Sequence, residues 1–279
     1  MRNYQKELDE IIAKHQQNGD VPRLLLHACC APCSSYCLEY LSQFFSITLF
    51  YYNPNIYPAS EYTHRVQEAK RLVESLPAKH PITFLEGTFD PQVFYDTVKG
   101  LEQEPEGGAR CERCYYLRLS EAAKEAKKGG FDYFTTTLSI SPLKSADKLN
   151  AAGEKAAAEY GVRHLPSNFK KKNGYKRSIE LSKEYDLYRQ DYCGCVYSLR
   201  KSTVDSQQSS VNSSAALRRR KTQKRTVPAI RFFFICHMLS TVDCRLSTFL
   251  KNTHTRSNPA GTDRMPSTAR SSVYSRSSF

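Results

Sequence analysis

The chain has 279 residues, of which 40% are hydrophobic and 25% charged, and its formal net charge is +13. This length and apolar content suffice for one sizeable packed domain, which argues against a chain that is disordered throughout. The charge is uneven, because residues 1–200 carry a net +2 and residues 201–279 a net +11.

Hydrophobic periodicity predicts helices and strands that alternate along residues 1–200. An amphipathic helix is expected at 3–16 and a buried strand at 23–30. Further helices are expected at 34–44, 60–76, 90–101, 107–130, 145–161 and 174–188, and further strands at 46–55, 82–89, 131–142 and 162–169. Strands that alternate with helices indicate an α/β fold, a parallel sheet with helices on both faces.

Two helix starts carry residues that commonly cap helices. Ser34 or Ser35 is expected to cap the helix after the first strand, and Ser60 the helix after the second. Both helices would then begin close to the carboxyl end of a strand. In parallel sheets, ligands collect at that end.

Residues 201–279 differ from the body in composition. They are rich in Ser and Arg, and we expect them to form a largely disordered tail after a domain at 1–200. The apolar stretch at 229–239 is too short to span a bilayer. The basic run at 218–225 is either solvated or attaches to nucleic acid or serves as a targeting address.

Cysteines are the most informative residues of the chain. Ten of them follow a polar start without a secretory signal, which indicates metal or redox chemistry in a reducing, cytoplasmic compartment. Seven form three groups that could meet at one edge of the sheet. The groups are Cys29, Cys30 and Cys33; Cys111 and Cys114; and Cys193 and Cys195.

The first two groups together offer enough thiolates for a metal site. Cys111 and Cys114 have the spacing of zinc and iron-sulfur ligands, and the start of a helix there favours the thiolate form. With Cys29 and Cys30 they supply four thiolates, enough for zinc or for a 4Fe-4S cluster. Both adjacent cysteines can face one centre only if the chain turns between strand and helix.

Cys193 and Cys195 are separated by a single glycine. Such a pair can close a small, strained and therefore labile disulfide ring. A redox dithiol, a pair of metal ligands and incidental thiols are the three interpretations. Of the remaining cysteines, Cys37 is expected to face the core, and Cys236 and Cys244 lie in the tail without an assigned role.

Five segments then point to a family. In order they are "HACCAPC", "FYYNPNIYPASEYTHR", "GGARCERCYYLRL", "FTTTLSISPLKS" and "YRQDYCGCVYSL". Over about residues 20–200 the chain resembles the QueH family of epoxyqueuosine reductases. The resemblance implies a fold similar to adenine nucleotide alpha-hydrolases. It also implies an iron-sulfur enzyme that acts on tRNA in the last step of queuosine synthesis.

The resemblance also assigns roles by motif. It implies that Cys29, Cys30, Cys111 and Cys114 ligate a 4Fe-4S cluster. It further implies that Cys193 and Cys195 form a redox-active disulfide, and that a second iron lies beside the cluster with Cys33 as its candidate ligand. A general acid is needed as well, and Tyr192, Asp191 and His27 are the candidates, although His27 on its apolar strand is also typical of a core histidine.

The substrate would be a modified wobble base in an anticodon loop, which is read by stacking and by contacts to phosphates. The basic segment at 169–177 either holds the RNA backbone or is a solvated loop. Its candidates are Lys170, Lys171, Lys172, Tyr175 and Lys176. Tyr51, Tyr52 and Asn53 are candidates for holding the base, and Lys144 for binding phosphate or capping a helix.

Two other functions fit part of this pattern. A tRNA-thiolating enzyme would share the fold, the RNA and the cluster, but residues 27–35 lack the glycines of an ATP-binding loop after the first strand. A non-enzymatic zinc-binding RNA module would explain four thiolates and leave Cys193 and Cys195 without a role. The electron donor and the oligomeric state are not encoded in any recognisable pattern.

Overall fold

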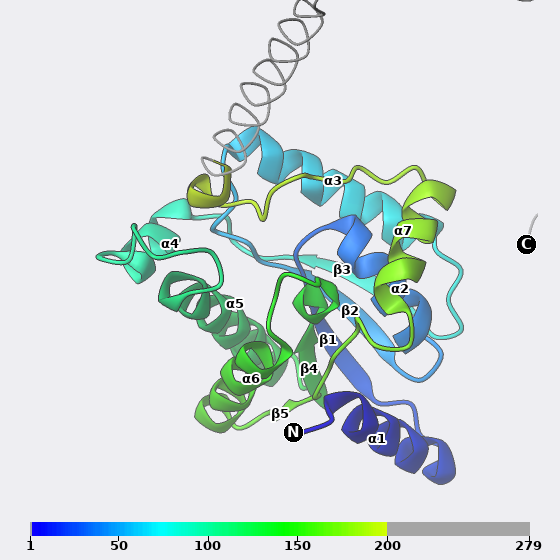
Figure 1. Cartoon of the computed structure of the whole chain (residues 1–279). Coiled ribbons are helices and arrows are strands. Elements are labelled where there is room, and N and C mark those ends of the chain that lie inside the picture. Colours follow the sequence, from blue (N-terminus) through cyan, green and yellow to red (C-terminus); the bar gives the residue numbers. More distant parts are fainter. Residues whose placement is uncertain (1, 200–279) are drawn as a thin grey trace, which may run out of the picture. The chain divides into compact units, whose positions relative to one another are not determined.

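A computed structural model of the chain describes residues 2–199 (Figure 1). Its centre is a five-stranded, all-parallel sheet with the strand order β3-β2-β1-β4-β5. The strands are β1 (Arg23–Ala28), β2 (Ser46–Tyr51), β3 (Ile82–Glu86), β4 (Tyr133–Thr136) and β5 (Arg163–His164). The predicted α/β fold is confirmed.

Helices cover both faces of this sheet (Figure 1). One face carries α1 (Tyr4–Asn18), α2 (Ala31–Leu41), α3 (Ala59–Ser75) and α7 (Gly174–Glu184). The other carries α5 (Ala109–Lys128) and α6 (Ala146–Tyr160), with α4 (Pro91–Val98) against α5. Among residues 2–199, no helix is both long enough and apolar enough to cross a membrane.

Strand β1 is buried from both sides, as its continuous apolar run predicts. Leu24 and Leu26 pack into the core on the α1–α3 face, whereas Leu25 packs with α5 on the opposite face. The strand order reverses on the two sides of β1, since β2 and β3 extend one way and β4 and β5 the other. Ligands of open α/β sheets bind at the carboxyl end of such a switch point, which here is the end of β1.

Three details of the sequence prediction were wrong. The strand expected at 131–142 ends at Thr136, because the Thr136 side chain accepts from the Leu138 N–H and starts a 3-10 helix, η1 (Thr137–Ile140). The fifth strand has two residues, since Pro166 follows closely and has no N–H to donate. The caps also differ: α2 starts after Cys30, and α3 after Pro58, without side-chain caps.

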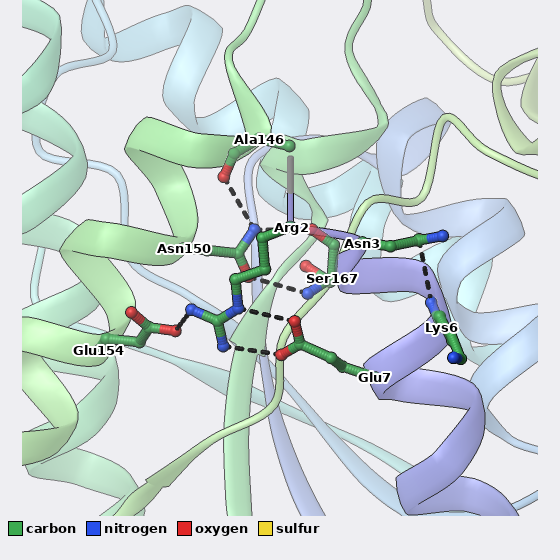
Figure 2. A network of polar contacts seen from close by, with 8 residues as sticks. All are labelled: Arg2, Asn3, Lys6, Glu7, Ala146, Asn150, Glu154 and Ser167. Carbon is green, nitrogen blue, oxygen red and sulfur yellow. Dashed lines mark hydrogen bonds and ion pairs between the residues drawn. The ribbon is translucent and has the colours of Figure 1, made fainter.

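A polar network joins the start of the chain to the α6 side of the sheet (Figure 2). The Arg2 guanidinium binds Glu7 on α1 at 2.6 Å and also binds Glu154 on α6. Nearby, the Asn150 amide donates to the Ser167 carbonyl at 2.9 Å and accepts from the Ser167 N–H. These bonds fix the segment that follows β5.

Residues 200–279 lie outside the described part of the chain. The expectations for the tail, its basic run, Cys236 and Cys244 therefore remain predictions.

Candidate active site

Three thiols gather where β1 ends. Ala28 is the last residue of the strand and Ala31 the first of α2, so the chain turns at Cys29 and Cys30, as the sequence required. The sulfur atoms of Cys29, Cys30 and Cys33 all lie within 4.8 Å of one another. Because Cys33 is in the first turn of α2, the positive end of that helix lies at this group.

The three thiols differ in the direction of their pKa shifts. Hydrogen bonds from Cys29 and Cys33, with the charge of Arg65 nearby, lower the pKa of Cys30 well below its ordinary value. Hydrogen bonding to Cys29 and Cys30 raises the pKa of Cys33 well above its own. Thiolate character therefore concentrates on Cys30, which a metal ion would bind most readily.

The second pair of thiols opens α5, which begins after Gly108. The backbone N–H of Gly107 donates to the sulfur of Cys111 at 3.2 Å and so orients this side chain. Cys114 lies one turn further on and is buried. Burial raises its pKa to about 12, against the opposing effect of Arg118, so without a metal this thiol is neutral.

The third pair lies in a loop that backbone hydrogen bonds hold in place. The Gly194 carbonyl accepts from the Tyr57 N–H at 2.8 Å, and the Cys193 N–H donates to Ser198 Oγ at 3.0 Å. The Cys193 carbonyl accepts from Arg65 at 3.4 Å. Gly194 has φ +123°, and a Cβ there would press on Arg65 at 3.1 Å, so glycine is required.

Two cavities meet at Cys193. The smaller is lined by Asn55, Phe94, Arg110, Cys111, Cys114, Tyr115, Arg118, Cys193 and Cys195. The larger has about 200 Å³, and its walls include Cys29, Cys33, Lys144, Tyr175, Asp191, Tyr192 and Cys193. The three cysteine groups are therefore neighbours, with the α5 pair and the Cys193–Cys195 loop on one side and the β1 group on the other.

Lys144 is one of two cations that line the larger cavity, the other being Arg189. Burial acts to lower the pKa of Lys144, but the thiols of Cys193 and Cys29 outweigh that effect and raise it. Lys170 donates to the Lys144 carbonyl at 2.6 Å and so holds the turn that carries it. Of the predicted substrate residues, Lys144 and Tyr175 line this cavity, and Lys170 supports it from behind.

The residues predicted to hold the base lie elsewhere. Tyr51, Tyr52 and Asn53 are all buried and are not among the residues that line the larger cavity. Asn53 donates to the Ala28 carbonyl at 2.8 Å and accepts from Arg118 at 3.2 Å. Its contacts support the turn that carries the first thiols.

The remaining basic residues differ in their partners. Lys172 pairs with Asp9 at 2.7 Å and lies over the ring of Tyr40. Lys171 and Lys176 are exposed and form no ion pair within residues 2–199. These two lysines have the free charge that an RNA backbone requires.

Two of the three general-acid candidates reach the larger cavity. Tyr192 and Asp191 line it. His27 is fully buried, donates to the Tyr52 carbonyl at 3.0 Å and accepts from Thr136. Burial lowers its pKa to about 4, so His27 is a neutral core histidine, the alternative that the sequence also allowed.

Three buried arginines beside the thiols, Arg65, Arg110 and Arg118, were not predicted. Arg65 is paired with Glu61 at 2.7 Å, and Arg118 lies four residues after Cys114 on α5. The spacing of Cys111, Cys114 and Arg118 puts them on one helix face, which is a signal that the sequence does contain. What the sequence lacks is any sign that this face is buried.

The site suits a group that is held by thiolates. Cys29, Cys30 and Cys33 converge closely enough to bind one metal ion. The wider set of seven thiols is accompanied by the cations Arg65, Arg118 and Lys144, and Nη2 of Arg65 is buried with no hydrogen-bond partner. Excess buried positive charge beside clustered thiols fits an anionic metal-thiolate centre.

Comparisons with known proteins agree on one family. Residues 24–201 match the family described as "Epoxyqueuosine reductase QueH". A protein of that name from Staphylococcus epidermidis is 41% identical over 219 residues, which cover 77% of this chain and 92% of the relative. The relative from Streptococcus pyogenes is 43% identical over 73% of this chain and 80% of its own length. The one from Haemophilus influenzae is 43% identical over 64% and 73%.

Proposed function

The chain belongs to the QueH family of epoxyqueuosine reductases, which are oxidoreductases, and on that basis we propose that it converts epoxyqueuosine to queuosine at the wobble position of tRNA. This would be the last step of queuosine synthesis. The observation that carries the proposal is the meeting of three cysteine groups around two cavities that share Cys193, at the carboxyl end of β1.

The reaction removes one oxygen atom from an epoxide and leaves an alkene. It consumes two electrons and two protons, and the oxygen leaves as water. Oxidation of the Cys193 and Cys195 thiols to a disulfide releases two electrons and two protons, which balances the reaction. An external two-electron donor then returns the disulfide to the dithiol.

Four thiolates would hold a 4Fe-4S cluster, namely Cys29, Cys30, Cys111 and Cys114, and Cys33 would bind an additional iron. When bound, such iron supplies electron transfer and Lewis acidity toward oxygen. The closeness of Cys29, Cys30 and Cys33 and the surrounding cations support this arrangement.

The remaining residues would bind the substrate and supply protons. Tyr192 and Asp191 line the cavity and are the candidates for protonating the departing oxygen. The Tyr192 hydroxyl donates to the Tyr57 carbonyl at 2.6 Å, and burial raises its pKa to about 12, so it retains its proton at neutral pH. Lys144 would attract the negative charge that develops on that oxygen.

The modified base must leave the stacked anticodon loop to reach the thiols. Tyr175, 38% exposed on the cavity wall, would stack on it or on a neighbouring base. Lys171 and Lys176 would bind the flanking phosphates.

The direct test is anaerobic incubation of the purified, iron-loaded chain with epoxyqueuosine-containing tRNA and a chemical reductant. Mass spectrometry of the tRNA nucleosides should show loss of one oxygen atom, and a Cys193→Ser/Cys195→Ser variant is the control. No loss of oxygen with the unaltered chain would reject the proposal. Zinc in place of iron and sulfide would favour the RNA-binding module instead.

A further inference from the structure

Arg118 is a buried cation at the point where the three cysteine groups meet. Its side chain is 2% exposed. Nη1 donates to Asn53 Oδ1 at 3.2 Å, and Nε donates to the Cys114 carbonyl at 3.3 Å. Both acceptors are neutral, and no carboxylate within residues 2–199 forms an ion pair with this guanidinium.

Of the other buried arginines near the thiols, Arg65 has an anionic partner, whereas Arg110 has more carbonyl acceptors than Arg118 and likewise no ion pair within residues 2–199. Arg65 has the carboxylate of Glu61 at 2.7 Å. Arg110 donates to three backbone carbonyls, which belong to Leu101, Glu102 and Glu104. A buried guanidinium without an anionic partner loses the solvation of its charge without electrostatic compensation, which destabilises the fold.

Among the described residues that line the same cavity as Arg118, those that can become anionic are four thiols and one phenol. Arg118 lines the cavity that holds Cys111, Cys114, Cys193 and Cys195. The groups whose charge acts on it most are Cys114, Cys193, Cys29 and Tyr115. Its charge is therefore compensated only when several of these thiols have lost their protons, which is what binding to iron does.

We propose that Arg118 is the internal counter-ion of the metallocluster, a positioning residue that binds no iron and raises the cluster's reduction potential through its charge. The inference rests on the proposed function, because it needs the cluster. A 4Fe-4S centre with four thiolates is anionic and becomes more so on reduction, so a nearby cation favours the reduced state.

The Arg118 guanidinium is also connected by hydrogen bonds to the backbone that precedes Cys29. It holds Asn53, and Asn53 in turn donates to the Ala28 carbonyl at 2.8 Å, just before Cys29. A lysine at 118 would keep the charge while losing the planar hydrogen-bonding geometry. Charge and geometry can thus be separated by substitution.

The experiment measures the midpoint potential of the iron-loaded full chain by spectroelectrochemical titration. Arg118→Met should lower the potential, and Arg118→Lys should keep it close to that of the unaltered chain. The matched control is Arg113→Met, which removes the same charge from an exposed position of α5 and should leave the potential unchanged.

A second measurement compares melting temperatures with and without iron and sulfide. The rise in melting temperature on loading with iron and sulfide should be smaller in Arg118→Met than in the unaltered chain. Without metal, the variant should melt at the same temperature as the unaltered chain or higher. Asn53→Asp provides a further variant, because it gives Arg118 a carboxylate partner. It should raise the melting temperature of the metal-free chain and lower the potential.

Equal potentials and equal loading gains in Arg118→Met and Arg113→Met would overturn the inference. If Arg118→Met does not fold, an unchanged potential in Asn53→Asp would overturn it in the same way. If the unaltered chain takes up no iron and sulfide, the proposed function fails rather than the role of Arg118 alone.

Discussion

The guanidinium of Arg65, on α3, donates to the backbone carbonyl of Cys193 at 3.4 Å, across 128 residues of sequence. The same side chain pairs with Glu61, and its positive charge adds to the hydrogen bonds from Cys29 and Cys33 that lower the pKa of Cys30. One arginine therefore connects the thiols that follow β1 with the Cys193–Cys195 loop. This contact makes α3 part of the site, although it carries no cysteine.

Replacing Arg65 should loosen that loop and destabilise the fold. Arg65→Met leaves the partly buried Glu61 carboxylate without its cation, which should lower the free energy of unfolding by about 2 kcal/mol in a denaturant titration, between the effects for exposed and fully buried pairs. Alkylation of Cys193 should become several-fold faster. Lys70→Met, which breaks an exposed ion pair on the same helix, is the control and should change neither value much. Unchanged alkylation in Arg65→Met would show that the other loop contacts suffice.

The dithiol proposal predicts that cofactor content and turnover separate. Cys193→Ser should retain the iron and sulfide of the unaltered chain, because the proposed cluster ligands are elsewhere. It should lose multiple turnover, because one hydroxyl and one thiol cannot supply two electrons as a disulfide. Metal analysis and steady-state product formation measure the two properties. Full steady-state activity would remove the redox role.

The cluster proposal predicts different results for two thiols. Cys111→Ala should lose the iron-sulfur centre, since three thiolates remain for a four-thiolate cluster. Cys37 is buried, and it donates to the Cys33 carbonyl at 3.4 Å from within α2. Cys37→Ala should therefore keep its iron and sulfide, which chemical analysis of both proteins can establish. Equal metal content in the two variants would exclude Cys111 as a ligand.

The basic segment should bind RNA through its unpaired lysines. Lys171→Gln/Lys176→Gln should weaken tRNA binding and reduce the slope of log affinity against log salt by about 1.4, roughly 0.7 for each lost phosphate contact. Lys172→Gln is the matched control, because Lys172 is already paired with Asp9 and should contribute less. Fluorescence titrations at several salt concentrations measure both slopes. A larger effect from Lys172 would move the RNA path toward α1.

Much of the molecule was predictable from local pattern. The order of helices and strands follows from periodicity, and the position of the thiols at the end of β1 follows from the parallel sheet. The wrong predictions came from side-chain hydrogen bonds that compete with strand pairing, which hydrophobic periodicity does not reveal. Thr136 uses its side chain to start a 3-10 helix where the pattern alone continues a strand.

The electrostatics of the site could not be predicted in the same way. Arg118 and Arg65 have the polar character of exposed helix residues, and only the packing of α3 and α5 against other elements buries them. Asn53, which precedes a proline, similarly looks like a turn residue in the sequence. Its support of the turn at Cys29 comes from contacts with Ala28 and Arg118. Such roles depend on distant pairs, which no local window of sequence contains.

Acid stability should depend on a histidine remote from the thiols. Burial, followed by the charge of Arg2, lowers the pKa of His164 from its ordinary 6.5 to about 3, and its Nδ1 is buried without a hydrogen-bond partner. The unfolded chain therefore binds this proton first, so stability is full above pH 6.5 and is lost as the pH falls toward 3. Between pH 6.5 and 5 this loss should reach at most about 2 kcal/mol, because one extra proton bound by the unfolded chain changes the free energy of unfolding by about 1.4 kcal/mol per pH unit.

His164→Leu should remove that part of the acid sensitivity. At pH 7 the variant should be about as stable as the unaltered chain, since leucine leaves no unpaired ring nitrogen. Denaturant titrations at pH 7 and pH 5 give the difference in unfolding free energy for each protein. His15→Leu is a poor control, because both nitrogens of His15 are bonded, to Asp20 and Tyr133. His80→Leu is better. His80 lies in the loop between α3 and β3 and takes no part in the burial or the Arg2 charge that lower the pKa of His164. An identical fall in stability for His164→Leu and the unaltered chain would show that His164 is not the responsible group.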